Sequence, residues 1–304
     1  MSNIKSILDL SIHKNIISIL SLSGKLGEDV GLEVYAVGGI VRDLIMGQNL
    51  NDIDIMVVGD GIQFAQKLAD KLKIKKVVKF EKFGTALIPN GDLQIEVASA
   101  RFESYKKNSR KPSKVIYTDL NGDLIRRDFT INAMAIDIRP KHFGDLIDPF
   151  GGIKDIESKI LKTPLDADET FSEDPLRMIR AAYFSSKLRF KIDNNCLRSI
   201  KNQSSRINIV SWERIREEFI KILKTKKPSI GLIILQKTGL MKIVFPEIDV
   251  MYGMDQTPEW HHKDIFAHTL QVVDNAAKLT NKMEIRFAAL VHDIAKPATR
   301  KIDP

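Results

Sequence analysis

The sequence predicts an α+β protein: a small mixed β-sheet head with helices on one side, followed by an all-α neck and body. Short β-like runs alternate with helical ones between residues 33 and 138, whereas beyond about residue 150 apolar residues recur at three- and four-residue spacing. A chain of 304 residues is also longer than a domain with a single hydrophobic core usually is. We therefore expect a head at 1–150, a neck at 151–228 and a body at 229–304.

The expected head elements follow one another closely. Runs rich in branched residues predict strands over Val34–Val37, Ile53–Val58, Val77–Phe80, Thr85–Ile88 and Leu93–Ala98. A short helix is expected after the first strand, and the turn Gly59-Asp60-Gly61 leads into an amphipathic helix at Ile62–Leu72. The turn Pro89-Asn90-Gly91-Asp92 separates the last two strands. These elements are enough for one small sheet.

The second half of the chain has the apolar spacing of helices. The expected helices are Glu173–Leu188, Asp193–Asn202, Trp212–Leu223 and Ile265–Leu279. Between head strands and neck, Tyr105–Lys114 is polar and strongly basic, which predicts a mobile loop.

Composition narrows the function classes. Lys and Arg number 47 against 39 Asp and Glu, which favours an anionic partner such as nucleic acid, although a solvated basic surface is an equal alternative on charge alone. Cys196 is the only cysteine, which excludes an intrachain disulfide and a cysteine-based zinc cage and indicates a reducing compartment. Because no 18 apolar residues run without a charge, we expect a cytoplasmic protein without membrane contact.

Two aspartates open the second predicted strand. Asp52 and Asp54 are two positions apart, so their side chains share one face of the strand, roughly 7 Å apart, while Ile53 faces a core. Hard carboxylate oxygens with no nearby His or Cys suit Mg²⁺, which leaves positions for water or a substrate phosphate. Glu96, on a neighbouring predicted strand, is the candidate third carboxylate. The pattern predicts two-metal phosphate chemistry.

A glycine pair precedes these aspartates. Gly38 and Gly39 allow the backbone to approach a triphosphate, and the following helix offers N–H donors to it. Arg42, one turn into that helix, adds a fixed positive charge for the same phosphates. Taken singly, Asp-x-Asp more often marks a turn or a solvated strand end, and Gly-Gly is weaker still. The joint order of the motifs is far more specific.

In that order, the sequence resembles the nucleotidyltransferase superfamily, and within it the class II tRNA nucleotidyltransferases (CCA-adding enzymes) and the related bacterial poly(A) polymerases. The resemblance runs from about residue 33 to 224. It implies that Asp52 and Asp54 bind catalytic Mg²⁺ and that Gly39 and Arg42 contact the incoming nucleotide.

A second stretch, Arg126–Ala135, is similar to the family's motif that holds the sugar and phosphates of the nucleotide. By that similarity, Arg127 is a nucleotide ligand and Asp128 contacts the ribose. The alternative is that this stretch is only the basic end of a helix followed by a strand. The presence of the first motif makes that interpretation the weaker one.

A third motif carries its own physical argument. Asp174, Arg177 and Arg180 recur every third residue, so on one helix they share a face. A carboxylate accepts and a guanidinium donates, so Asp174 and Arg177 can pair with the amino group and ring nitrogen of cytosine and adenine, whereas guanine and uracil present the reverse order. The resemblance assigns base selection to this pair, with Arg180 in support. The alternative is a surface salt-bridge ladder that includes Glu173. Tyr183 stands where many relatives carry a further arginine.

Two further stretches complete the resemblance. Ser211–Phe219 is similar to the last helical motif of the family, which braces the neck, and Tyr105–Lys114 is then a place to meet the RNA 3′ end. Trp260–Leu270 and Leu290–Pro297 resemble HD phosphohydrolases. The candidate ligands of a second metal are His268, His292 and Asp293. The HD family needs one more aspartate on a later helix, and Asp303 comes too early, so we expect either a fragment or a remnant domain.

Together the motifs predict a template-independent, Mg²⁺-dependent enzyme that adds C and A residues from CTP and ATP to the tRNA 3′ end and releases pyrophosphate. Three alternatives stay open. The first is a CC-adding enzyme, an A-adding enzyme or a poly(A) polymerase, each of which has the same head. The second is an HD-type phosphohydrolase with an RNA-binding head, and the third is a catalytically silent tRNA-binding protein.

Overall fold

The computed structural model describes residues 14–50, 52–105, 112–254 and 264–299. They fold as two compact units. The first unit holds the described residues up to Ser158 together with Lys162–Leu165, and the second holds Lys159–Leu161 and the described residues from Asp166 onward. Among these residues, the helices are too short or too polar for any of them to cross a membrane.

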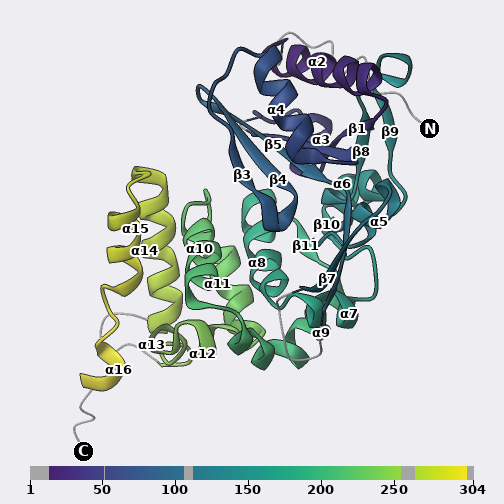
Figure 1. The fold of residues 1–304 in the computed structure, drawn as a ribbon. Helices are drawn as coiled ribbons and strands as arrows, with labels where there is room; N and C mark the ends of the chain where they lie inside the picture. Colours follow the sequence, from purple (N-terminus) through teal and green to yellow (C-terminus); the bar gives the residue numbers. More distant parts are fainter. Residues whose placement is uncertain (1–13, 51, 106–111, 255–263, 300–304) are drawn as a thin grey trace, which may run out of the picture. The chain divides into compact units, whose positions relative to one another are not determined.

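A seven-stranded mixed sheet forms the centre of the first unit, in the order β3-β4-β5-β2-β1-β8-β9 (Figure 1). Its strands are β1 (Glu33–Val37), β2 (Asp52–Val58), β3 (Val78–Phe80), β4 (Thr85–Asn90), β5 (Leu93–Ser99), β8 (Ala135–Asp137) and β9 (Asp145–Ile147). Only β2 and β5 pair in parallel, and the other neighbours are antiparallel. This pairing brings the two predicted carboxylate strands next to each other.

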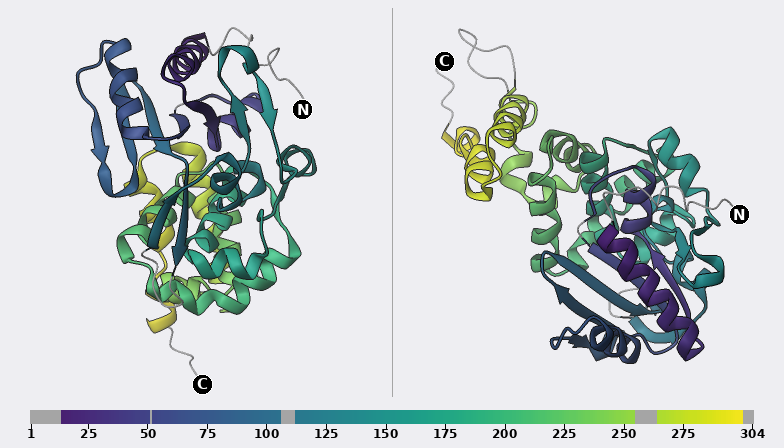
Figure 2. Two further views of the ribbon diagram at one scale, coloured as in Figure 1. Left: turned by 45° about the vertical axis from the view of Figure 1, so that its right-hand side comes forward. Right: turned by 90° about the horizontal axis from the view of Figure 1, so that it is seen from above.

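Three helices of this unit share one face of the sheet, as Figures 1 and 2 show. They are α2 (Lys14–Val30), α3 (Gly39–Ile45) and α4 (Gly61–Lys71). With alternate strand residues such as Val34, Ile55 and Val97 they form the main core. A smaller cluster on the opposite face includes Tyr35, Met56 and Leu124 of the short helix α5 (Leu120–Ile125). The remaining elements are α6 (Gly152–Ser158) and the separate hairpin of β6 (Arg101–Tyr105) and β7 (Pro112–Tyr117).

The second unit is mostly helical. Its helices are α7 (Ala167–Glu173), α8 (Leu176–Leu188), α9 (Asn194–Gln203), α10 (Trp212–Leu223), α11 (Pro228–Lys237), α12 (Met241–Val244), α13 (Pro246–Asp249), α14 (Ile265–Leu279), α15 (Met283–Val291) and α16 (Lys296–Thr299). Helix α8 packs against α10 and α11, and α14 packs against α11 and α15 (Figure 1). The predicted α+β class, with a mixed-sheet head and a helical remainder, is confirmed.

Several local expectations need correction. The part expected to be all-α contains a two-residue parallel pair, β10 (Ile160–Leu161) with β11 (Lys191–Ile192). The single helix expected over Glu173–Leu188 is two helices, α7 and α8. The expected loop Tyr105–Lys114 begins and ends in strands β6 and β7, and its middle, residues 106–111, lies outside the described residues.

Candidate functional site

Three carboxylates meet on one face of the sheet. In the parallel ladder, Asp52 lies opposite Gln94 and Asp54 lies opposite Glu96, and directly opposite residues share a face. Asp52 and Glu96 are exposed, Asp54 is half-buried, and Ile53 between the aspartates is fully buried in the core on the other side. The predicted alternation is confirmed, and the register brings the three predicted metal ligands together.

Burial and neighbouring carboxylates raise the pKa of Asp54 and of Glu96. Burial, then the charges of Glu96 and Asp52, raise the pKa of Asp54 to about 6, although Arg127 and Arg42 oppose this. Partial desolvation also raises the pKa of Glu96, and Asp52 adds to the effect against the guanidinium groups of Arg101 and Arg127. The neighbouring arginines therefore do not fully neutralise this negative cluster. Its hard oxygen donors and its excess of negative charge fit a bound Mg²⁺.

This electrostatic cost predicts a pH dependence of stability in the metal-free protein. Because Asp54 keeps its proton up to about pH 6 in the folded state but loses it near 3.8 in the unfolded state, the free energy of unfolding falls as pH rises through that window. Urea denaturation in a chelator at pH 4, 5, 6 and 7 should show this fall, and Asp54→Asn should make it shallower, leaving the contribution of Glu96. A parallel profile in the variant would contradict the burial of charge at Asp54.

The two glycines have different structural roles. Gly38 has a φ of 76° and a ψ of −128°, a conformation that only glycine adopts readily. A Cβ on Gly38 would lie 2.6 Å from Nη1 of Arg127 and 3.7 Å from Oδ2 of Asp54. A Cβ on Gly39 would make only an ordinary contact, 3.6 Å from Nη2 of Arg42. Gly38 therefore makes room for the Arg127 guanidinium beside the carboxylates.

Gly38→Ala should displace Arg127 and weaken nucleotide use. Gly47→Ala is the matched control, because Gly47 also has a positive φ, 62°, but no atom lies within 4 Å of its added Cβ. Backbone strain should cost Gly47→Ala roughly 1–2 kcal/mol. It should cost Gly38→Ala about 1–3 kcal/mol, because the ψ of −128° at Gly38 lies outside the left-handed helical region. Only Gly38→Ala should raise the KM for nucleotide. Equal KM values for nucleotide in both variants would show that Gly38 does not determine the position of Arg127.

Asp123, in the first turn of α5, holds the Arg127 side chain. Oδ2 of this carboxylate accepts hydrogen bonds from Nη2 of Arg127 at 2.8 Å and from its Nε at 3.1 Å, while Oδ1 accepts one from Nη2 of Arg126 at 2.8 Å. Burial alone would raise the pKa of Asp123, but Arg127 and Arg126 outweigh it and hold the pKa below its ordinary value. Sequence reasoning missed this residue, although its spacing of four from Arg127 was a usable signal.

Asn132, which was not a predicted ligand, links two predicted nucleotide ligands of this unit, Arg42 and Asp128. Its Oδ1 accepts a hydrogen bond from Nη1 of the buried Arg42, and its Nδ2 donates to Oδ1 of Asp128 at 3.0 Å. Arg42 also makes a two-pronged ion pair with Asp43, at 2.7 and 2.9 Å. Oδ1 of Asp128 further caps the backbone N–H of Phe129 at 2.9 Å. Asp128 therefore has a structural role here, and its contact with a ribose stays a prediction.

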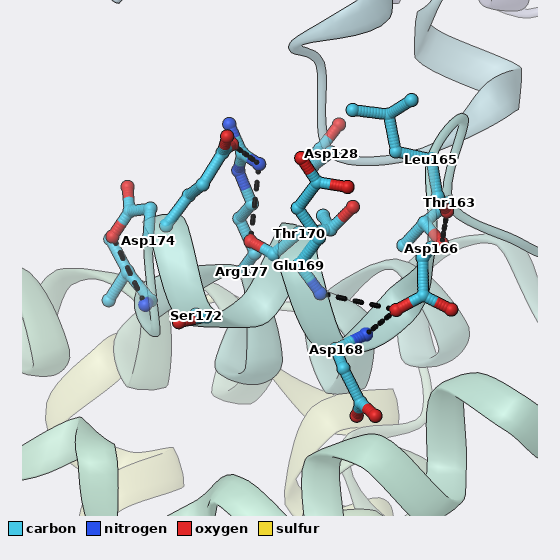
Figure 3. A network of polar contacts seen from close by, with 12 residues as sticks. Asp128, Thr163, Leu165, Asp166, Asp168, Glu169, Thr170, Ser172, Asp174 and Arg177 are labelled. Carbon is cyan, nitrogen blue, oxygen red and sulfur yellow. Dashed lines mark hydrogen bonds and ion pairs between the residues drawn. The ribbon is translucent and has the colours of Figure 1, made fainter. Parts of the chain in front are cut away.

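The predicted base-selecting residues lie in the second unit. Arg177 of α8 donates to the carbonyl of Thr170 and pairs with Glu173, both at 3.2 Å (Figure 3). The Glu173–Arg177 ion pair of the salt-bridge alternative is thus present. Nη1 of Arg180 lies 3.6 Å from Oε1 of the buried Glu218 of α10.

Asp174 was expected on the same helical face as Arg177 and Arg180, and this was wrong. It lies between α7 and α8 with φ −134° and ψ 97°, because Pro175 follows it and the residue before a proline is driven out of the helical region. Its Oδ1 accepts a hydrogen bond from the backbone N–H of Leu176 at 3.2 Å (Figure 3). Its Oδ2 lies 3.5 Å from Nη2 of Arg214, a contact that sequence reasoning missed.

Comparison with known families covers both units. Residues 34–162 match the poly A polymerase head domain, residues 189–252 match the probable RNA and SrmB-binding site of polymerase A, and residues 265–303 match the HD domain. A solved CCA-adding enzyme, apo form II, is 31% identical with a TM-score of 0.78, and the match covers 97% of this chain and 67% of that one. The chain belongs to the class II CCA-adding enzyme and poly(A) polymerase family.

Other relatives in this family carry more specific names. A Multifunctional CCA protein of Vibrio campbellii is 35% identical over 88% of this chain, and an A-adding tRNA nucleotidyltransferase of Geobacter sulfurreducens is 34% identical over 89%. The chain spans 64% of the Vibrio protein and 29% of the Geobacter protein. A tRNA nucleotidyltransferase complexed with a primer tRNA and an incoming ATP analog is 28% identical, with a TM-score of 0.70 over 89% of this chain and 75% of that one.

The HD-like part of this family member brings three potential metal ligands together. Ligand atoms of His268, His292 and Asp293 lie within 4.8 Å of one another. Oδ2 of Asp293 lies 3.2 Å from Nε2 of His292 and 3.9 Å from Nε2 of His268. Nδ1 of His292 lies 2.9 Å from the Ala289 carbonyl, which leaves Nε2 to face the cluster. Nζ of Lys296 lies 2.8 Å from the same oxygen of Asp293.

Proposed function

We propose that this protein adds C and A residues from CTP and ATP to the 3′ end of tRNA without a nucleic-acid template and releases pyrophosphate. The observation that carries the proposal is the placement of Asp52, Asp54 and Glu96 on one face of adjacent strands. Arg127 and Arg42 exert their positive charge on that cluster. The names of the Vibrio and Geobacter relatives support tRNA as the acceptor.

In the proposed reaction, Asp52 and Asp54 hold Mg²⁺, with Glu96 beside them. Bound there, Mg²⁺ lowers the pKa of an attacking hydroxyl and stabilises the leaving oxygen. Arg42 and Arg127 bind the triphosphate and keep its α-phosphate in line with the RNA 3′ hydroxyl. Gly38 and Gly39 keep the backbone free of side chains next to these groups, and Asp128 is the proposed ribose contact.

Base selection is proposed for Asp174 and Arg177, with Arg180 in support. Arg214 and the backbone N–H of Leu176 both donate to the Asp174 carboxylate, which is an acceptor-only group when ionised. A carboxylate in that form can accept from the amino group of cytosine or adenine and would meet the carbonyl of guanine or uracil unfavourably. We propose the corresponding division into a catalytic head at 1–150, a base-selecting and RNA-binding neck at 151–228 and an HD-bearing body at 229–304.

Incorporation assays test the proposal. Purified protein is incubated with tRNA that lacks its last three nucleotides, separately with CTP, ATP and both. Completion of the 3′ end only when both nucleotides are present supports full CCA addition. Use of CTP alone or ATP alone would replace it with a CC-adding or A-adding function. Long A tails on unrelated RNA, without CTP use, would contradict it in favour of a poly(A) polymerase.

A second candidate function rests on His268, His292 and Asp293. We propose that they bind a divalent transition metal in a phosphoester-hydrolysing site, since imidazole and carboxylate ligands suit such ions. The Lys296 ammonium, which contacts Asp293, would compete with the metal for that oxygen.

Metal binding at this cluster should stabilise the parent protein. Added Mn²⁺ or Ni²⁺ at about 100 times its Kd should contribute about 2.7 kcal/mol and raise Tm by several degrees. The His292→Ala variant should show no such rise, and Lys296→Met should bind the metal more tightly. Equal Tm shifts in the parent and His292→Ala would eliminate this site.

A further inference from the structure

The sheet face that carries the carboxylates continues to the edge strand β3. One row across the sheet consists of Asp54, Glu96, Leu87 and Val78, and the next row consists of Met56, Ala98, Thr85 and Phe80. Because directly opposite residues share a face, Phe80 lies on the same face as Asp54 and Glu96. With strands about 4.8 Å apart and a rise of about 3.3 Å per residue, Phe80 is roughly 12 Å from Glu96. A single RNA strand can cross that distance in a few nucleotides.

Two exposed aromatic rings lie at this edge. Phe80 is 46% exposed and Phe83, in the 3₁₀ turn Glu81–Phe83, is 44% exposed. Neither ring is needed to fill a core, since the main cluster of this unit forms on the opposite face of the sheet. A single exposed ring is ordinary on a protein surface, whereas neighbouring exposed apolar side chains can form a contact surface.

Positive charge links Phe83 to the carboxylates. Cζ of Arg101 lies 5.8 Å from the centre of the Phe83 ring, and Nη1 of Arg101 donates to the Phe83 carbonyl. Thr85 donates its hydroxyl to the same carbonyl at 3.2 Å. The positive charge of Arg101 also acts on Glu96. The exposed Lys82 lies next to Phe83 in the chain. The turn is thus fixed in place and has a net positive charge, because Lys82 and Arg101 outnumber the exposed Glu81.

We propose that Phe80 and Phe83 form a stacking platform for the single-stranded 3′ end of the acceptor RNA, upstream of its terminal nucleotide. The inference rests on the proposed function, which requires the RNA 3′ hydroxyl at the carboxylates and its preceding nucleotides nearby. Planar aromatic rings next to cations suit unpaired bases and phosphates. Because every base has a π face, such a platform accepts a growing end whatever base was added last. A protein partner would have less use for a basic rim beside a metal-binding face.

Binding of a short single-stranded RNA ending in ACC, measured by fluorescence anisotropy, tests the platform directly. The double variant Phe80→Ala/Phe83→Ala should bind at least about tenfold more weakly, as expected for the loss of base stacking. Phe287→Ala in α15 is the matched control, because Phe287 is also 44% exposed, and it should bind like the parent. Thermal melts establish that the variants are folded.

The shape of the replacing side chain decides between stacking and general apolar contact. Phe80→Trp/Phe83→Trp should retain the parent affinity, whereas Phe80→Leu/Phe83→Leu should lose it. Parent-like RNA binding by either the Ala or the Leu double variant would overturn the platform. Parent-like binding by the Leu double variant would also indicate that the surface suits an apolar partner such as a protein.

Incorporation assays keep this result separate from the proposed function. If the parent extends tRNA and the Ala pair shows a higher KM for RNA at an unchanged KM for nucleotide, the platform is supported. If the parent extends tRNA and the Ala pair has the parent's KM for RNA, the platform is overturned and the function stands. If the parent extends nothing while RNA binding still depends on the rings, the function falls and the platform remains.

Discussion

Asp54→Asn is expected to abolish nucleotide incorporation. The substitution keeps the shape of the side chain but removes the charge that lies between Asp52 and Glu96 on the shared sheet face. Bound divalent metal contributes several kcal/mol to stabilising the charge that develops in phosphoryl transfer. At about 1.36 kcal/mol per factor of ten, its loss should slow single-turnover incorporation by roughly a thousandfold or more. Affinity for tRNA should change little, because the proposed mechanism places Asp54 at the reacting phosphates rather than at the body of the RNA.

Asp60→Asn provides the matched control for this loss. Asp60 is an exposed aspartate just beyond the same strand, and it caps α4 by accepting a hydrogen bond from the backbone N–H of Gln63 at 2.9 Å. Asparagine caps helices about as well as aspartate. Incorporation by Asp60→Asn should therefore match that of the parent. Residual turnover of Asp54→Asn within tenfold of the parent, with the control unaffected, would contradict the metal role of Asp54.

Local periodicity was sufficient to predict the carboxylate face. The alternation of Asp52, Ile53 and Asp54 specifies which side chains share a face, and the strand limits follow from branched residues between turns. The pairing of β2 with β5 rests on contacts between segments about 40 residues apart in sequence, so Glu96 was only a candidate until the register placed it opposite Asp54.

Tertiary contacts explain most of what the sequence did not predict. Helix α2 contains Gly24 and Gly27, which lower helix propensity, yet a Cβ on Gly24 would overlap the carbonyl of Ile138. Close packing against the sheet therefore requires the very residues that weaken the helical signal.

Arg214 contacts Asp174 from forty positions away in the sequence, and no spacing rule predicts that contact. The break at Asp174 was different, since Pro175 was a local signal that the apolar periodicity concealed.

Asp123→Asn should impair both folding and nucleotide binding. Asp123 is only 1% exposed, and its two oxygens accept three hydrogen bonds from Arg126 and Arg127. In the variant, the new amide N–H₂ would face one of the guanidinium groups as a second donor. Because both arginines remain partly exposed to water, we expect a loss of about 2–4 kcal/mol, somewhat below that of a fully buried pair.

The kinetic consequence distinguishes positioning of Arg127 from simple support of the fold. Without its anchor, Arg127 can adopt other rotamers, so the KM for nucleotide should rise at least about tenfold, equivalent to 1.4 kcal/mol. The factor should be the same for CTP and ATP, since a phosphate contact does not depend on the base, and the KM for RNA should be unchanged. Asp119→Asn is the control within the same short helix, because Asp119 is its exposed N-cap and asparagine can replace it. A folded Asp123→Asn protein with the parent's KM for both nucleotides would show that Asp123 stabilises the fold without setting the position of Arg127.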